Sequence, residues 1–174
     1  MSSAYLHDLA VDLLVAAEAA VDPICTGNEL PPRRYVSYGE PAWDICQGDE
    51  RVAASGQLVT WWADVQPVVS AQGRSCAIQY RGRLCVELAR CFPSLSADSQ
   101  PLPAEVYEAA AAVVSTDAWA LVRGVGAWVA SLGCSWAQIE DVFPSGPEGG
   151  MAAVRICIRL ELDDPDPACT PPAP

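Results

Sequence analysis

The chain contains no lysine and only one histidine, and both absences limit its chemistry. Its ten basic residues are all arginine, and 22 acidic residues bring the net charge to −12. Nucleic-acid binding draws its affinity from cations that neutralise phosphates, so direct DNA binding is not expected. Adsorption to an anionic membrane surface is disfavoured for the same reason. Histidine is the most frequent general base, yet His7 lies on the polar side of a predicted helix.

The familiar motifs of catalysis and nucleotide binding are also missing. No GxSxG elbow, HExxH motif, P-loop or GxGxxG fingerprint occurs. Carboxylates are plentiful, with adjacent pairs at Glu140–Asp141 and Asp163–Asp164. Neighbouring residues of a strand point to opposite faces, so Glu140 and Asp141 are not expected to share a site. We therefore expect no enzyme, no metal site and no cofactor.

Long hydrophobic runs are absent as well. No apolar stretch reaches the roughly 18 residues that a membrane helix needs. Residues 1–21 lack the basic start of a signal peptide, and Asp8 and Asp12 interrupt their apolar stretch. These features predict a protein that remains in the cytoplasm where it is made.

Cysteine, in contrast, is abundant. No two of the eight cysteines have a CxxC spacing, and one histidine poorly supplies a mixed Cys/His zinc site. Free cysteine is among the most buried residue types, so we expect most of them to be small buried apolar residues. The alternative is disulfides that form after release into oxidising surroundings. Spacing does not assign pairs among Cys25, Cys46, Cys76, Cys85, Cys91, Cys134, Cys157 and Cys169.

The composition indicates a folded chain, because 51% of the 174 residues are hydrophobic and 18% are charged. We expect a single domain over residues 1–162. The tail at 163–174, DDPDPACTPPAP, is acidic and proline-rich. Such a composition favours an extended segment that does not fold alone.

Helical spacing of apolar residues predicts a first helix from Ser2 or Ser3 to about Val21. A second helical region starts near Pro103 and ends at Gly133. Residues 115–117, Ser-Thr-Asp, are strong N-cap types and predict that this region has two parts. Gly124 and Gly126 inside it weaken the helix but allow close backbone packing.

Alternating or β-branched stretches predict five strands, at 43–46, 57–69, 83–92, 136–143 and 151–162. The strand at 83–92 alternates in a way that suits a sheet with one face on the core. Between the helix and the strands, residues 23–42 read as a long irregular connection, and 93–102 and 144–150 read as loops. The predicted class is α+β: an N-terminal helix, an antiparallel or mixed sheet of about five strands, and a central helical segment between the third and fourth strands.

Two tryptophans and two arginines are candidates for contact with a partner. On a strand, one of Trp61 and Trp62 faces the core and the other faces outward. Three roles are open for the outward ring. It fills a partner's pocket, it stacks on a sugar, or it is buried because both faces of the sheet are covered. Arg33 and Arg34 are a solvated pair or part of a contact surface.

In the order of these segments and in their residue patterns, the chain resembles tail terminator proteins of bacteriophages with long flexible tails. The resemblance spans residues 4–162. It rests on AYLHDLAVDLLVAAEAAV, PPRRYVSYGEPAWDICQGDERVAASGQLVTWW, RLCVELARCF, PLPAEVYEAAAAVVSTDAWALVRGVGAW and GGMAAVRICIRLEL.

The resemblance implies a small subunit of a hexameric ring that sits on the last layer of the tail tube, stops polymerisation and meets the head connector. DNA passes through such a ring without specific binding, and no membrane is involved. The subunit starts in the host cytoplasm and ends in the virion. The residues expected at its contacts are Trp61, Trp62, Arg33, Arg34, Arg155 and Arg159.

Other functions remain open. A stopper or adaptor of the head-to-tail connector is the nearest, although an adaptor should be mainly helical and a stopper mostly a β-barrel. A carbohydrate-binding module would use Trp61 or Trp62 as a platform, and an enzyme would use a reactive cysteine such as Cys85 or Cys134.

Overall fold

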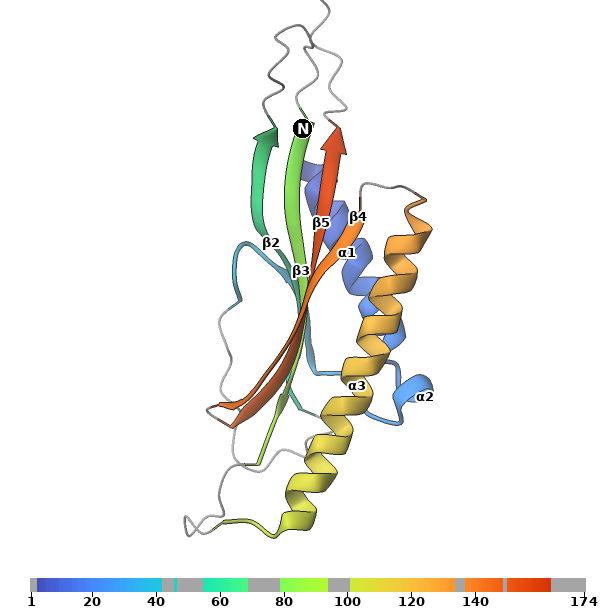
Figure 1. The fold of residues 1–174 in the computed structure, drawn as a ribbon. Coiled ribbons are helices and arrows are strands. Elements are labelled where there is room, and N and C mark those ends of the chain that lie inside the picture. The colour runs from blue at the N-terminus through green and yellow to red at the C-terminus, as the bar shows by residue number, and fades with distance from the viewer. Residues whose placement is uncertain are drawn as a thin grey trace, which may run out of the picture.

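The computed structural model describes residues 3–41, 46, 55–68, 79–93, 101–133, 137–148 and 150–163. It has two layers, a twisted five-stranded sheet and the helices that cover one of its faces (Figure 1). This arrangement confirms the predicted α+β class. In chain order the elements are α1 (Ser3–Ala20), α2 (Pro23–Thr26), β1 (Arg33–Ser37), β2 (Gln57–Val68), β3 (Gln79–Cys91), α3 (Ala104–Ser131), β4 (Ala137–Glu148) and β5 (Met151–Asp163).

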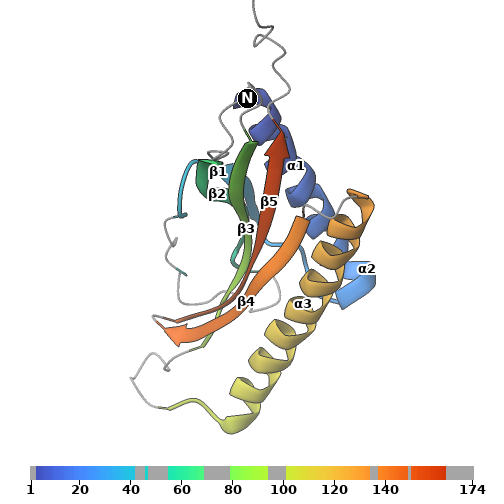
Figure 2. The ribbon, with the colours of Figure 1, turned by 45° about the horizontal axis from the view of Figure 1, so that its top comes forward.

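The strands lie in the order β1-β2-β3-β5-β4 (Figure 2). The first pair, β1 and β2, is parallel, and the other three neighbouring pairs are antiparallel. The central strand is β3, which pairs with β2 on one side and β5 on the other. Within the described part of the chain, β1 and β4 are therefore the two open edges of the sheet.

The main core lies between the sheet and the two long helices. The predicted stripe of the first helix is buried there, and it packs against apolar residues of α3, β3 and β5. Full burial of each leucine contributes roughly 1.5–3 kcal/mol. At Gly124 a Cβ atom would lie only 2.2 Å from the Cβ of Ala20, so glycine permits the close approach of α3 to α1. No comparable contact exists at Gly126.

The segment predicted as an irregular connection contains two regular elements. The Asp22 carboxylate accepts a hydrogen bond from the Ile24 N–H at 2.8 Å and caps α2, which ends at Gly27 with a φ of 75°. Further on, β1 pairs with β2 from Arg33↔Gln57 to Ser37↔Trp61. The prediction missed β1 because a short parallel strand depends on a distant partner, which local periodicity does not reveal.

The central helical region is one continuous helix, and its predicted division into two parts is wrong. The residue types at 115–117 suggested a cap, but Asp117 is buried in the middle of α3. Its carboxylate has a partner on β3 instead of the backbone of its own helix.

The strand predicted at 136–143 is longer than expected. Pairing of β4 with β5 continues through Pro144 and Ser145 to Glu148, so residues 144–148 are not a loop. The register shifts between Ser145 and Glu148, where Gly146 has a φ of 106°. A proline is tolerated here because β4 is an edge strand.

Several predicted features lie outside the described residues. These are most of the strand at 43–46, most of the loop at 93–102, and the tail from residue 164 onward. Cys46 itself is described and has no regular secondary structure. The predicted strands at 57–69, 83–92 and 151–162 correspond to β2, β3 and β5 and are confirmed.

The sheet is buried on both faces near its centre, contrary to the expectation for β3. Leu84, Val86 and Leu88 face the helices, but Cys85 and Glu87 on the other side are buried as well. Val59, Trp61, Cys85 and Cys157 form a second buried cluster on the face turned away from α1 and α3, here called the outer face.

A buried ion pair joins the two layers. The Arg90 Nε of β3 donates to the Asp117 Oδ2 of α3 at 2.8 Å, and each side chain is 1% exposed. The other Asp117 oxygen accepts from the Asn28 Nδ2 at 2.8 Å. The remaining guanidinium nitrogens donate to the backbone oxygens of Ser55 and Glu29. Each charge is thus paired and hydrogen-bonded, which a buried charge requires.

Among the described residues, no helix combines the length and apolar character needed to cross a membrane.

Replacement of Asp117 by alanine leaves the Arg90 guanidinium buried without its counter-charge. We expect the free energy of unfolding in urea to fall by about 3–5 kcal/mol. As a control, Thr116→Ala at the exposed neighbour should change it by at most about 0.5 kcal/mol. A loss below about 1 kcal/mol for Asp117→Ala would show that the pair does not hold α3 on the sheet.

Candidate functional site

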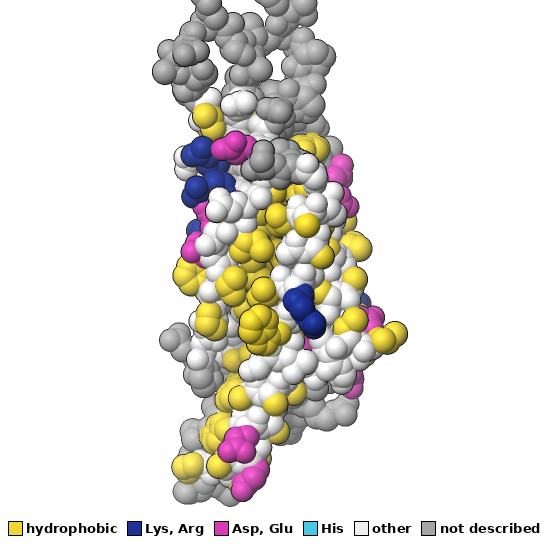
Figure 3. All heavy atoms as spheres, turned by 45° about the vertical axis from the view of Figure 1, so that its right-hand side comes forward, with side chains coloured by type: hydrophobic (Ala, Val, Ile, Leu, Met, Phe, Trp, Pro, Cys, Tyr) yellow, Lys and Arg dark blue, Asp and Glu magenta, His cyan; other side chains and the backbone are white. Residues whose placement is uncertain are grey.

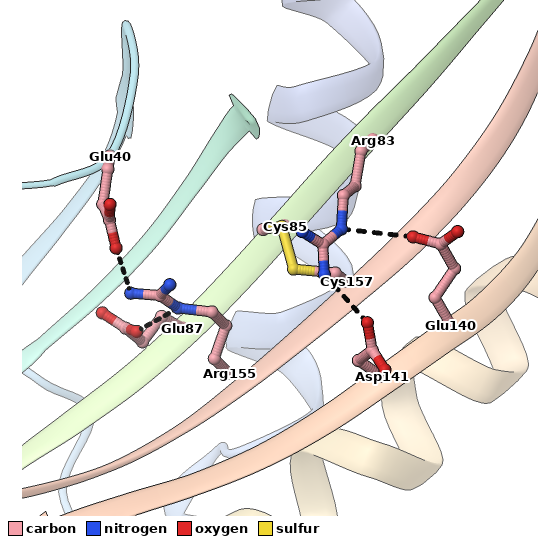
Figure 4. Close-up of a disulfide and its surroundings, with 8 residues drawn as sticks. All are labelled: Glu40, Arg83, Cys85, Glu87, Glu140, Asp141, Arg155 and Cys157. Carbon is pink, nitrogen blue, oxygen red and sulfur yellow. Dashed lines mark hydrogen bonds and ion pairs between the residues drawn. A yellow bond between two sulfur atoms is a disulfide. The ribbon is translucent and has the colours of Figure 1, made fainter. Parts of the chain in front are cut away.

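The outer face carries a ladder of charged side chains around a disulfide (Figure 4). Strand alternation and register place them there, because Cys85 is opposite Cys157, with Glu87 opposite Arg155 on one side and Arg83 opposite Arg159 on the other.

One cluster is centred on Arg155. Its Nε donates to Glu87 Oε2 and its Nη2 donates to Glu40 Oε1, each at 2.7 Å. The guanidinium also lies over the Trp61 ring, 5.1 Å from the centroid. Arg155 therefore links β5 to β3, to β2 and to the segment that follows β1. This predicted partner-contact residue has structural partners within its own chain.

Glu87 is a buried acid of the outer face. Burial raises the pKa of its carboxyl, and the hydrogen bond and the charge of Arg155 offset only part of that rise. Its Oε1 atom has no hydrogen-bond partner in the described structure, although the residue is only 1% exposed. Glu87 thus costs stability when it is ionised, because one carboxylate oxygen is desolvated without compensation.

A second cluster brings together Arg83, Arg159, Glu140 and Asp141. Arg83 Nε lies 3.2 Å from Glu140 Oε2, and Arg83 Nη2 donates to Asp141 Oδ2 at 2.9 Å. Arg159 also pairs with Glu140. The expectation that the two adjacent carboxylates point to opposite faces is wrong. A register shift between Ile139 and Asp141 inserts Glu140 as an extra residue and turns both carboxylates to the outer face.

These two clusters neutralise charge within the chain. Each described arginine of the clusters faces at least one carboxylate, which fixes β4 to β3 across β5 and anchors the segment after β1. Among the described residues, no group of three histidine, cysteine or carboxylate side chains is placed to hold a metal ion. The ion pairs hold neighbouring strands together.

The cysteines differ from the expectation of free buried thiols. Cys85–Cys157 and Cys46–Cys91 are disulfides, so four of the described cysteines are paired rather than free. The first joins directly opposed residues of β3 and β5, and the second ties the connection between β1 and β2 to the end of β3. Cys25 is free and exposed. A reactive thiol at Cys85 is not present in this structure, and Cys134 lies outside the described residues.

Both tryptophans predicted as contact residues pack within the chain. Trp61 is 2% exposed in the outer-face cluster. Trp62 is half-buried against the main core, and its Nε1 donates to the Leu6 backbone oxygen at 2.8 Å. Gly82 makes room for that ring, because a Cβ there would lie 2.4 Å from it. The alternative of a sheet buried on both faces is the one observed, and Trp61 offers no platform to a sugar.

The two arginines that were predicted as contact residues in the connection at 23–42 lie on the edge strand β1. Arg33 and Arg34 are both exposed, and Arg34 Nε is 3.9 Å from Glu18 Oε1 of α1. An exposed pair at this distance contributes little stability. His7 is exposed on α1, on the polar side as predicted.

The most conspicuous surface is apolar, and the sequence analysis missed it. Figure 3 views the molecule from the right-hand side of Figure 1 and shows a band of hydrophobic side chains along that side. Trp119 of α3 is 70% exposed, and Val142 and Phe143 of β4 are also exposed. Trp119 lies away from the buried side of α3, which carries Ala120, Leu121, Val125 and Trp128. A large aromatic residue at such a position is the sequence signal of this surface.

Comparison with known proteins adds no relative. No protein-family model matches the chain, and no curated protein matches it in sequence.

The raised pKa of Glu87 gives the stability a defined dependence on pH. The folded protein retains the Glu87 proton above pH 4.5, where the unfolded chain has released it. The contribution of Glu87 is therefore fully present at lower pH and is lost as the pH rises through its folded pKa. We expect the unfolding free energy of the wild type, relative to Glu87→Gln, to fall as the pH rises from about 4.5. An equal slope for both proteins in urea titrations at several pH values would contradict the raised pKa.

The two disulfides predict a labelling pattern. Protein unfolded in urea without reductant should leave Cys46, Cys85, Cys91 and Cys157 unmodified by iodoacetamide, while Cys25 reacts. Replacement of Cys85 and Cys157 by alanine should lower the unfolding free energy by about 2–4 kcal/mol. Cys25→Ser, the control, should leave it within about 0.5 kcal/mol. Alkylation of Cys85 before reduction would contradict the cross-strand bond.

Proposed function

We propose that this chain is a structural subunit of a ring that closes the tail tube of a long-tailed bacteriophage and joins it to the head connector. The resemblance in the order of its segments motivates the proposal. Support comes from the two open edges of the sheet, β1 and β4, which lie at opposite ends of the strand order.

Two different open edges suit a cyclic assembly. A subunit that offers one edge to each of two neighbours makes head-to-tail contacts, and such contacts generate a ring when the rotation closes. The exposed apolar residues beside the β4 edge strengthen this reading, because exposed apolar patches mark contact sites.

The internal pairing of charges also supports a role in assembly. The outer-face arginines are engaged by carboxylates of the same chain and contribute little to phosphate binding. With a net charge of −12, a ring of such subunits surrounds DNA with a surface that does not grip it.

Native mass spectrometry of the purified chain, alone and with tail-tube subunits, tests this function. We expect an assembly near six times the 18.4 kDa subunit mass, and its binding to tube protein. Addition of the chain to polymerising tube protein should also shorten the tubes seen by electron microscopy. Tube protein alone is the control for length. A strict monomer that ignores tube protein and leaves tube length unchanged would contradict the proposal.

A further inference from the structure

We propose that the β4 edge of one copy pairs with the β1 edge of the next copy, with Val142 and Phe143 placed against Val36 and Tyr35. This inference rests on the proposed ring for the presence of neighbouring copies. It goes further in assigning which residues form the contact.

The register of the sheet places the two edges at the same height. Each residue of β1 can be followed across the strands through its direct partners. One such row is Tyr35, Val59, Glu87, Arg155 and Phe143, and the next is Val36, Thr60, Val86, Ile156 and Val142. The rows therefore connect β1, from Arg33 to Ser37, with β4, from Ser145 to Asp141.

The strand directions are compatible as well. β1 is parallel to β2, and three successive antiparallel pairings make β4 antiparallel to β1. Where the β4 edge of one copy meets the β1 edge of a copy in the same orientation, the two strands therefore run antiparallel, as do most neighbouring strands of this sheet.

The side chains at the two edges also match in character. Val142 and Phe143 are exposed large hydrophobic residues on β4. At the same height on β1, Tyr35 and Val36 are half-buried apolar side chains. The alternation of both strands puts Phe143 and Tyr35 on the outer face and Val142 and Val36 on the helix side, so each pair faces the same way.

Helix α3 adds further apolar surface to that of the β4 edge. From Ala109 to Ser131, α3 has only two charged residues, the buried Asp117 and the exposed Arg123. A surface helix normally carries charged or polar residues on its outer side, whereas α3 exposes Trp119 and several alanines there.

A second copy is the occupant that this geometry favours. The chain itself carries an edge of matching height, opposite direction and apolar character, and an unrelated partner would have to reproduce all three. Pro144 supplies no N–H to the pairing, so the side chains of Val142 and Phe143 contribute a large share of the contact.

Phe143→Glu tests the contact, because Phe143 is about half exposed and belongs to neither buried core cluster, so we expect the variant to fold. Its matched control is Val106→Glu, which places the same charge on an exposed apolar position near the start of α3. In native mass spectrometry and light scattering, we expect at least tenfold weaker self-association for Phe143→Glu and wild-type assembly for Val106→Glu. Retention of the wild-type ring by Phe143→Glu would overturn the inference and leave the proposed function standing.

A photo-crosslinker identifies the partner surface directly. With benzoylphenylalanine in place of Phe143, we expect crosslinks to the peptide that contains residues 33–38 of a second copy. Crosslinks to β4 or α3 of the second copy, or to tube protein alone, would overturn the edge pairing without affecting the ring itself. A wild-type chain that never self-associates, even with tube protein present, would instead remove the proposed function.

Discussion

One buried ion pair, between Arg90 and Asp117, ties the middle of α3 to the sheet. It joins the central strand of the sheet to the middle of a 28-residue helix. Asn28 and the backbone of Ser55 and Glu29 complete its hydrogen bonds, so the same pair also anchors the chain before β1 and before β2. A helix held at its midpoint buries one side on the sheet and displays the other. The exposed apolar side of α3 is therefore a consequence of how the core is built.

The outer face shows the opposite arrangement, since its charges are used internally. Arg155 is held by Glu87 and Glu40, and Arg83 by Glu140 and Asp141. Together with the disulfide under them, these contacts hold the strands in register. Among the described strands, β1 and β4 each pair on one side alone, and exposed apolar side chains lie on β4. Edge strands and exposed apolar side chains are features that contacts with another protein surface use.

Local patterns were sufficient for some elements and insufficient for others. Helical spacing located α1, alternation located β3 and β5, and β-branched and aromatic residues located β2, because each of these signals lies within one stretch of sequence. β1 could not be seen, since its parallel partner is 24 residues away at Arg33↔Gln57. Asp117 was misread as a cap because its partner lies on another element. The bulge at Glu140 and the disulfides depend on strand register, which no single stretch of sequence contains.

The central claim is that the chain works by joining copies of itself through its sheet edges. Hydrogen–deuterium exchange of the assembled ring, compared with the dissociated subunit, tests it most directly. The claim predicts slower exchange on assembly at backbone amides of residues 33–37 and 141–145, with little change in the central strand β3. Equal exchange at both edges in the two states, with protection confined to other surfaces, would contradict it.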